Sequence, residues 1–454
     1  MHRQILLLAL SSVSLSACAN NLASHEPHAA PPSAAVAEPA PAPKPAIGDY
    51  GFDTSGMDKS VAPGANFYNY ANGTWTKNTP IPADKANYGL FTALDDLSKD
   101  RTKEILEGAK DDQNSKIGNA YASYLDQATV EAKGLAPIKP WLDTITNSKT
   151  SADYVKLVAE ASRNGIPTPF SGYVDQDDKN PDSYIYKMEQ AGLGMPDRDY
   201  YLLGDAKMVE TRKAYLAHLE KMFTLAGETD GAKRAAAILA FETAIAKAHW
   251  TRIDSRDADK TYNKMSIAQL TKLAPGFDFA TALKASGVNS DTILVAQPTA
   301  IKGEAALIAK TPLAVLRDQI LIRSLDQYSD ELPDAIGNES FAFYGTTLSG
   351  TPQREERWKR AVTFVKDSLG EELGKTYVAK YFPPETKAAA DALVKNVIAA
   401  MGRRIDTLTW MSTEAKARAH AKLAAFTPKI GYPDKWRDYA GLEIKRDDLF
   451  GNAI

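Results

Sequence analysis

The segment from Trp410 to Trp436 reads WMSTEAKARAHAKLAAFTPKIGYPDKW and is the most informative stretch of this 454-residue chain. Ser412 and Thr413 supply hydroxyl groups that can cap a helix, and Glu414 falls in the first turn, where the helix dipole favours a carboxylate. Alanine and lysine, both good helix formers, fill the body. Pro428 ends this run, and a glycine and a second proline then mark a turn between aromatic residues. The segment is therefore predicted to be a helix followed by a turn.

Five other blocks have equally specific sequences: NFYNYANGTWTKNTPIPADKANYGLF (Asn66–Phe91), GLGMPDRDYYL (Gly192–Leu202), WTRIDSRDADKTYN (Trp250–Asn263), FYGTTLSGTPQREERWKRAV (Phe343–Val362) and GKTYVAKYFPP (Gly374–Pro384). Together with segment 410–436 they closely resemble the neprilysin/endothelin-converting-enzyme family of zinc metallopeptidases, and they occur in the family's order. The resemblance runs from about Tyr50 to the last residue. It implies a large helical lobe that covers an active-site cleft, followed by a thermolysin-like lobe that holds the zinc.

Helical periodicity agrees with a mainly α fold. Apolar residues recur at helical spacing from Ile117 to Leu125 and from Tyr154 to Ala161. Alternating apolar residues on both sides of DDKNPD, between Phe170 and Gln190, predict one minor β-hairpin. Further long helices are predicted over residues 205–227, 232–250, 311–328, 357–372, 385–409 and 412–426.

The predicted organisation has four parts. Residues 1–18 form a lipoprotein signal peptide, and residues 19–47 form a tether that is mostly alanine and proline and favours extended polyproline II structure. By the resemblance, residues 48–400 form the helical peptidase lobe and residues 401–454 begin the catalytic lobe. The final stretch, RDDLFGNAI, has no glycine or proline exit signal after it, so we expect the sequence to stop inside that lobe.

A truncated catalytic lobe would leave its first residues poorly supported. Leu449, Phe450 and Ile454 are then expected to have little to pack against, and exposed apolar side chains favour association. The segment after about Trp436 is accordingly predicted to be mobile and sensitive to proteases.

Cys18 is the only cysteine, which excludes an intramolecular disulfide. A basic start at Arg3 and an apolar run precede Leu15-Ser16-Ala17-Cys18, which resembles a bacterial lipobox. We predict lipidation at Cys18; the alternative is a simple signal peptide with an incidental cysteine. Because Ala19 is not aspartate, the expected location is the outer membrane, with the folded part facing the periplasm.

No catalytic or metal-binding residue is predicted within this chain. A zinc hydrolase of this class needs two histidines one helical turn apart, with a glutamate between them, in an HExxH sequence. None of the six histidines begins such a sequence: His2, His25, His28, His218, His249 and His420. The last three lie in helical patterns and are interpreted as packed or solvated. The resemblance places zinc and its ligands in the full-length family enzyme, beyond Ile454.

His25 and His28 lie close together in the tether, on either side of a Glu-Pro pair. A metal site is the alternative interpretation of this spacing. We expect none, because a disordered segment interrupted by proline cannot hold ligand geometry.

Two charged clusters have competing interpretations. The first is Asp197, Arg198 and Asp199, in which two carboxylates flank one guanidinium. Arg198 could bind a peptide carboxylate. The preferred interpretation is a structural ion-pair network that fixes a loop. Mixed charges between Arg252 and Lys260 predict a solvated or lobe-bridging surface.

The first of these blocks, Asn66–Phe91, is called the opening block here and departs from the family at two positions. Vertebrate members have a cysteine where this chain has Asn72, so the extracellular disulfide framework is missing. Mammalian members have an arginine, which binds the terminal carboxylate of the substrate, where this chain has Asn87. Asparagine cannot form a charge-assisted fork, which favours endopeptidase action over removal of a terminal dipeptide. The aromatic residues of this block are expected to serve core and inter-lobe packing: Phe67, Tyr68, Tyr70, Trp75, Tyr88 and Phe91.

Two functions follow as hypotheses. The first is the N-terminal part of a lipid-anchored zinc metalloendopeptidase that hydrolyses short peptides in the bacterial envelope. The alternative is a non-catalytic lipoprotein that binds peptide or protein with the same helical lobe. A net charge of −3 without a basic block excludes a typical nucleic-acid-binding protein.

Overall fold

The computed structural model describes residues 54–454. Cys18, the lipobox and the tether at residues 19–47 lie outside the described residues, so those expectations stay predictions. The chain divides into two compact units, Met1–Thr79 and Pro80–Ile454. None of the helices in the described range combines the length and the apolar character needed to cross a lipid bilayer.

The described part of the first unit is a short helical pair. Asn66 begins α1 (Phe67–Asn78), because its side-chain oxygen accepts a hydrogen bond from the Asn69 amide at 2.9 Å. The preceding 3₁₀ helix η1 (Thr54–Gly56) packs against α1, where Gly56 faces Trp75.

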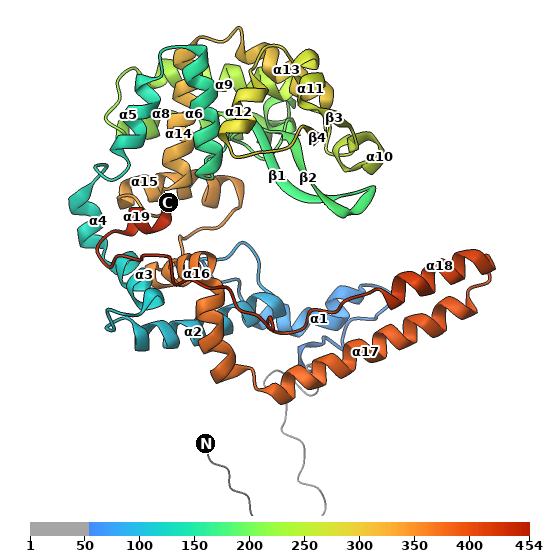
Figure 1. The fold of residues 1–454 in the computed structure, drawn as a ribbon. Helices are drawn as coiled ribbons and strands as arrows, with labels where there is room; N and C mark the ends of the chain where they lie inside the picture. The colour runs from blue at the N-terminus through green and yellow to red at the C-terminus, as the bar shows by residue number, and fades with distance from the viewer. Residues whose placement is uncertain (1–53) are drawn as a thin grey trace, which may run out of the picture. The chain divides into compact units, whose positions relative to one another are not determined.

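Helices dominate the second unit, as Figure 1 shows. They are α2 (Leu90–Ala109), α3 (Lys116–Leu125), α4 (Gln127–Lys133), α5 (Lys139–Asn147), α6 (Ser151–Arg163), α7 (Asp199–Leu202), α8 (Ala206–Leu225), α9 (Gly231–Ala248), η2 (Asp254–Arg256), α10 (Ala258–Thr261), α11 (Ile267–Leu273), α12 (Phe279–Ala285), α13 (Pro298–Ile308), α14 (Leu313–Gln327), α15 (Asp334–Ser340), the π-helix η3 (Phe341–Leu348), α16 (Arg357–Tyr381), α17 (Pro384–Thr407), α18 (Thr413–Ala424) and α19 (Leu449–Ala453). The eight helices expected from periodicity are confirmed. The helix predicted over 357–372 continues to Tyr381 through a kink at Leu369.

A four-stranded sheet packs among these helices in the order β1-β2-β4-β3. The predicted hairpin is confirmed as β1 (Phe170–Asp177) and β2 (Asn180–Gln190), which pair antiparallel with Phe170 opposite Gln190. The sequence did not reveal β3 (Lys264–Ser266) or β4 (Thr292–Val295), which are too short for an alternating pattern to show. The class is mainly α with a small sheet, as expected.

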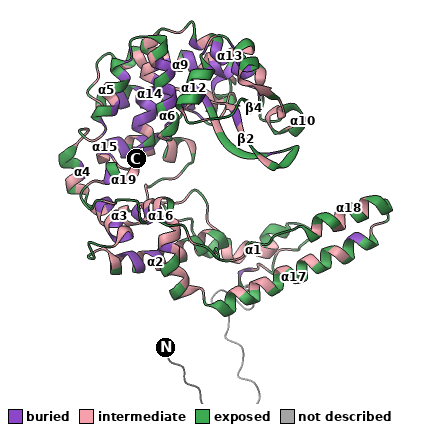
Figure 2. Ribbon diagram, viewed as in Figure 1, coloured by how far each residue is buried: buried purple, intermediate pink, exposed green. Residues whose placement is uncertain are grey.

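Two hydrophobic cores hold the second unit together, and Figure 2 shows the buried residues gathered in them. The larger core is built mainly on α5, α6, α8, α9 and α14 and includes fully buried Tyr215 and Phe223. The smaller core joins α2, α3 and α16 around Leu106, Tyr121 and Leu369. Burial of such side chains contributes about 1.5–3 kcal/mol each to folding.

The prediction that the last residues lack packing partners is wrong for Leu449 and Phe450. Leu449 is buried in the smaller core, while Phe450 is buried in the larger core, with its ring 5.1 Å from that of Tyr328. Asn452 donates a hydrogen bond to the Ser123 hydroxyl at 3.1 Å. Of the three residues in that prediction, Ile454 alone is exposed, as expected. Helix α19 therefore contributes one side chain to each core, although its residues are distant in sequence from those that they contact.

The expected start of a catalytic lobe at residue 401 lies inside α17, which continues unbroken from Pro384 to Thr407. That boundary stays a prediction. The following segment returns along the second unit, because the Lys116 ammonium donates hydrogen bonds to the carbonyl oxygens of Tyr439, Ala440 and Leu442.

Candidate functional site

A buried carboxylate, Glu242, organises the segment around Gly192–Leu202. Its side chain is fully buried on α9 and accepts hydrogen bonds from the hydroxyls of Tyr201 at 2.7 Å and Tyr215 at 2.9 Å. Arg323 of α14, which is also buried, forms an ion pair with the other carboxylate oxygen. Charge buried to this extent requires such partners, because an unpaired carboxylate would be strongly destabilised.

The same network fixes the glycine-rich loop. Gln319 donates to Glu242 at 3.0 Å and to the Gly192 carbonyl at 2.8 Å, and the Gly194 amide donates to the Tyr201 hydroxyl at 2.9 Å. A Cβ atom at Gly194 would collide with the Arg323 guanidinium, so only glycine allows the close approach. The sequence contained one signal for this network, a glutamate on the apolar face of α9.

His218 lies at the end of the same network and is packed inside the larger core. Its ring nitrogens lie 3.2 Å from carboxylate oxygens of Asp326 and Glu339, and the ring stacks on Phe343. Burial by itself lowers the pKa of His218, but the two hydrogen bonds outweigh burial and raise the pKa to about 9. His218 is therefore a charged, structural residue at neutral pH.

The other two histidines have different surroundings. His249 Nε2 lies 2.7 Å from Glu304 Oε1 and 3.0 Å from the Ala191 carbonyl oxygen. Burial lowers the pKa of His249 to about 4 and raises the pKa of Glu304 well above its ordinary value, so both side chains are neutral. His420, on α18, pairs with Asp406 at 2.7 Å and is partly exposed. The interpretation of these histidines as packed or solvated is confirmed.

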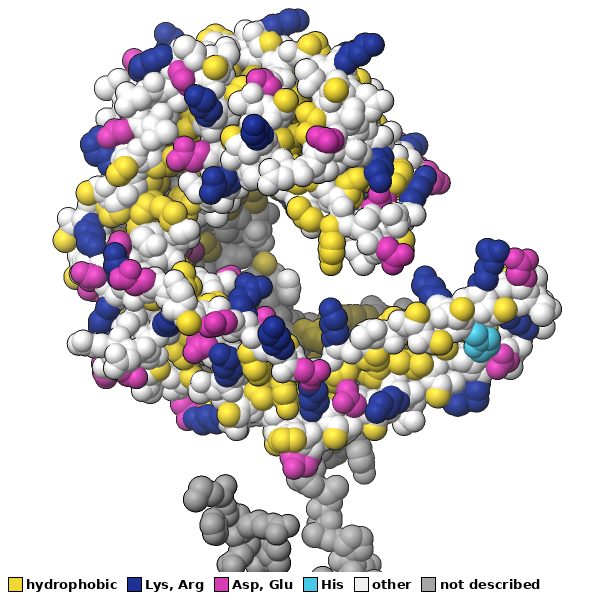
Figure 3. Space-filling model, in the orientation of Figure 1, with side chains coloured by type: hydrophobic (Ala, Val, Ile, Leu, Met, Phe, Trp, Pro, Cys, Tyr) yellow, Lys and Arg dark blue, Asp and Glu magenta, His cyan; other side chains and the backbone are white. Residues whose placement is uncertain are grey.

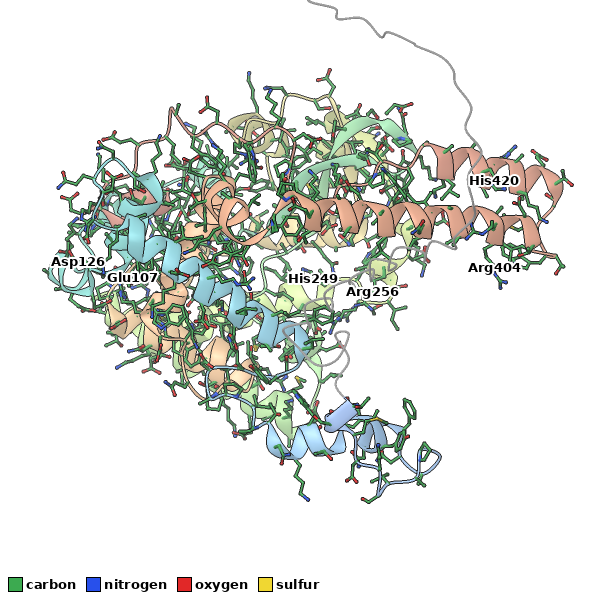
Figure 4. All side chains as sticks on the ribbon, turned by 90° about the horizontal axis from the view of Figure 1, so that it is seen from below. Glu107, Asp126, His249, Arg256, Arg404 and His420 are labelled. Atoms are coloured by element: carbon green, nitrogen blue, oxygen red, sulfur yellow. The ribbon has the colours of Figure 1, made fainter. Side chains whose placement is uncertain are left out.

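No zinc site can be assembled from the described part of the chain. Figure 4 shows His249 and His420 on separate elements, and within residues 54–454 no three side chains of histidine, cysteine, aspartate or glutamate are placed to hold a metal ion. These residues therefore do not fit the catalytic zinc that the resemblance implies.

The charged residues of the Asp197–Asp199 segment are arranged differently from the expected network. Asp197 pairs with Arg252 at 3.1 Å and accepts a hydrogen bond from the Asp199 amide at 2.8 Å. Arg198 is half-buried and donates to the His249 carbonyl at 2.6 Å, at the C-terminal end of α9. No carboxylate among residues 54–454 pairs with Arg198. The prediction of an ion-pair network around Arg198 is therefore wrong: the segment forms one ion pair, between Asp197 and Arg252.

The cluster from Arg252 to Lys260 is a solvated surface, as one of its two interpretations predicted. The Arg252 side chain is mostly exposed, and Lys260 pairs with Asp254 at 2.6 Å. Surface pairs of this kind contribute little to stability, because water screens both charges.

The turn before α2 presents an uncharged surface. Asn87 is exposed, and Phe91, one turn further on, has an exposed fraction of 88%. The ammonium group of nearby Lys85 forms ion pairs with Glu355 at 2.8 Å and with Asp96 at 3.2 Å. Among the opening-block aromatics, Phe67, Tyr68 and Phe91 are exposed, so they are not core residues, and inter-lobe packing stays a prediction for them.

The hairpin of α17 and α18 has little core of its own. Leu393, Val397 and Met401 follow one another at four-residue spacing on α17 and are all at least half exposed, as are Trp410 and Phe426 beyond them. Figure 3 shows hydrophobic side chains along this hairpin. In the two helices only Ile405 is buried. A contiguous apolar surface of this kind typically contacts another part of a protein.

Comparison with known proteins identifies relatives over most of the chain. The family model for Peptidase family M13 matches residues 63–433. Human endothelin-converting enzyme 1 is 27% identical over 400 residues, which cover 84% of this chain and 51% of that protein. The crystal structure of Mycobacterium tuberculosis zinc metalloprotease Zmp1 in complex with an inhibitor is 35% identical, with a TM-score of 0.82, over 88% of this chain and 62% of that one.

A further solved structure, PepO from Lactobacillus rhamnosis, shares the fold with a TM-score of 0.71 at 20% identity, over 81% of this chain and 60% of that one. The chain spans about half the length of the curated relatives that it matches.

Proposed function

Because this chain belongs to peptidase family M13, we propose that it forms the N-terminal helical part of a zinc-dependent metalloendopeptidase acting on short peptides in the bacterial cell envelope. The match of the family model over residues 63–433 is the observation that supports this proposal. The zinc and its ligands would belong to a part of the enzyme outside the present sequence, since the sequence has no HExxH and the described residues do not fit a zinc site.

The exposed apolar stripe of α17 is consistent with a second lobe. Leu393, Val397 and Met401 present adjoining side chains along one side of the helix and would be covered in the complete enzyme. Exposed Asn87, with no charge to hold a terminal carboxylate, supports endopeptidase action.

The DNA that follows the Ile454 codon tests the proposal directly. An open reading frame that encodes an HExxH helix supports the peptidase. A stop codon at that position would contradict it and favour the alternative, a non-catalytic peptide-binding or protein-binding lipoprotein built on the same helical lobe.

The 454-residue chain by itself is predicted to hold no stoichiometric zinc and to hydrolyse no peptide, because its described residues offer no ligand set. Metal analysis after dialysis, together with an assay on an unstructured peptide, measures both. Retained zinc at one equivalent, with hydrolysis that a chelator stops, would overturn this prediction.

We also propose that a lipid on Cys18 anchors the protein to the outer membrane, on the periplasmic side. The proposal rests on the Leu15-Ser16-Ala17-Cys18 sequence and the alanine- and proline-rich segment that follows it.

Replacing Cys18 with serine is predicted to block lipidation and maturation, because the thiol is the acceptor of the lipid. Membrane fractionation and mass spectrometry of the mature N-terminus measure the effect. A variant that is processed and fractionates like the parent would show that the anchor lies elsewhere.

A further inference from the structure

A cavity of about 630 Å³ opens between the start of β1, the loop at Gly192–Arg198 and the loop that follows α9. Its wall is rich in polar groups and contains one carboxylate, that of Asp197, and two guanidinium groups, those of Arg198 and Arg252. Asp197 and Arg252 neutralise each other at 3.1 Å. The remaining charge of the wall is therefore the positive charge of Arg198.

Arg198 is poised to bind an anion. It uses one N–H group on the His249 carbonyl, and no other hydrogen bond or ion pair joins its guanidinium to a described residue. The carboxyl group of Glu304 lies 2.7 Å from His249 and forms no ion pair with Arg198. A half-buried guanidinium with unused N–H groups, in the wall of a cavity, is well suited to a carboxylate.

A second cavity of about 440 Å³ adjoins the first, because Ser162 and Gly172 belong to both walls. Its surface is more apolar and includes Val174, Tyr184 and Tyr186 of the hairpin. A Cβ atom at Gly172 would collide with the Tyr186 ring, so this glycine lets the ring lie across β1. The two cavities follow β1 from Phe170 to Val174, about 13 Å, the length of three to four extended residues.

We propose that these two cavities form a peptide-binding site in the helical lobe. Arg198 binds the C-terminal carboxylate of an extended peptide, and the cavity at Tyr184 and Tyr186 receives an apolar side chain two or three residues before the C-terminus. The size, the positive charge of Arg198 in the first cavity and the more apolar second cavity match a peptide terminus better than a small inorganic anion. This site goes beyond the proposed peptidase function, since it requires neither zinc nor a catalytic lobe.

The test measures binding to the purified 454-residue chain by fluorescence anisotropy, with a chelator present so that hydrolysis plays no part. The probe is an N-terminally labelled pentapeptide with phenylalanine at its third position and leucine at its end, as the free acid and as the C-terminal amide. We expect the amide to bind at least tenfold more weakly. A C-terminal amide with an internal glutamate distinguishes a terminal carboxylate from a side-chain carboxylate, and competition by inorganic phosphate detects a general anion site.

Arg198→Gln is expected to weaken binding of the free acid at least tenfold and to leave binding of the amide unchanged. Arg198→Lys, which keeps the positive charge, should recover part of the affinity. Arg403→Gln is the matched control, because Arg403 is an exposed arginine of α17 outside both cavities and has no ion pair among the described residues. Thermal unfolding of each variant verifies folding.

Several results would overturn the proposal. These are equal binding of acid and amide, equal binding of the internal-glutamate amide and the free acid, full competition by millimolar phosphate, or a loss of affinity in Arg403→Gln but not in Arg198→Gln. Hydrolysis by the complete enzyme is a separate measurement, so failure here leaves the proposed peptidase function standing.

Discussion

Replacing Glu242 with leucine is expected to lower the free energy of unfolding by about 3–5 kcal/mol, the usual effect of breaking a buried ion pair from one side. The substitution leaves the buried guanidinium of Arg323 without its carboxylate. It also leaves the hydroxyls of Tyr201 and Tyr215 and the amide of Gln319 with one acceptor fewer. Urea unfolding followed by circular dichroism measures the change.

A matched control lies on α8. Glu210 is exposed and pairs with Lys213 across one helical turn, so Glu210→Leu should change stability by less than about 1 kcal/mol. The double variant Glu242→Met with Arg323→Met should recover part of the loss, because it removes both charges and restores packing. Equal effects of Glu242→Leu and Glu210→Leu would show that the buried network does not stabilise the fold.

A second large effect is expected from pH through His218. The pKa of its ring in the folded protein is about 9, above the ordinary value of 6.5, so the folded state holds this proton more tightly than the unfolded state. The stabilisation is complete below pH 6.5 and is lost as the pH rises through 9, by about 3 kcal/mol in total. The difference in unfolding free energy between the parent and His218→Gln should therefore shrink by about that amount from pH 6 to pH 9.5.

Taking the difference in unfolding free energy between the parent and His218→Gln removes the contributions of the other groups that titrate between pH 6 and pH 9.5. His420→Gln is the control for replacing a histidine on a partly exposed surface, where the pair with Asp406 contributes little to stability. Parallel pH profiles for the parent and His218→Gln would mean that His218 stays neutral between its two carboxylates.

Much of the secondary structure was predictable because its causes are local. The spacing from Ile117 to Leu125 and the alternation on either side of the β1–β2 turn are visible within a dozen residues. Strand β4 was not predictable, because its four residues, of which three are apolar, have no period of their own. It is a strand because Tyr186, Lys187 and Met188 of β2 provide a parallel partner.

The candidate sites divide in the same way. The absence of HExxH and the blocks that resemble M13 peptidases are properties of the residue order itself. The contacts of Arg198 could not be predicted from the residue order. Arg198 donates a hydrogen bond to the carbonyl of His249, and the neighbouring Asp197 forms an ion pair with Arg252. Each partner lies about fifty residues further along the chain.

By itself, then, the sequence determined the helical class, the positions of eight helices and the family, since capping, periodicity and sequence motifs are local, extending over one or a few turns. The tertiary structure decided which charges meet: Glu242 with Arg323, and His218 with Asp326 and Glu339. It also decided that α19 packs between two cores. The physical reason is that burial and long-range pairing depend on segments brought together only by folding, and a side chain's surroundings there have no local signature.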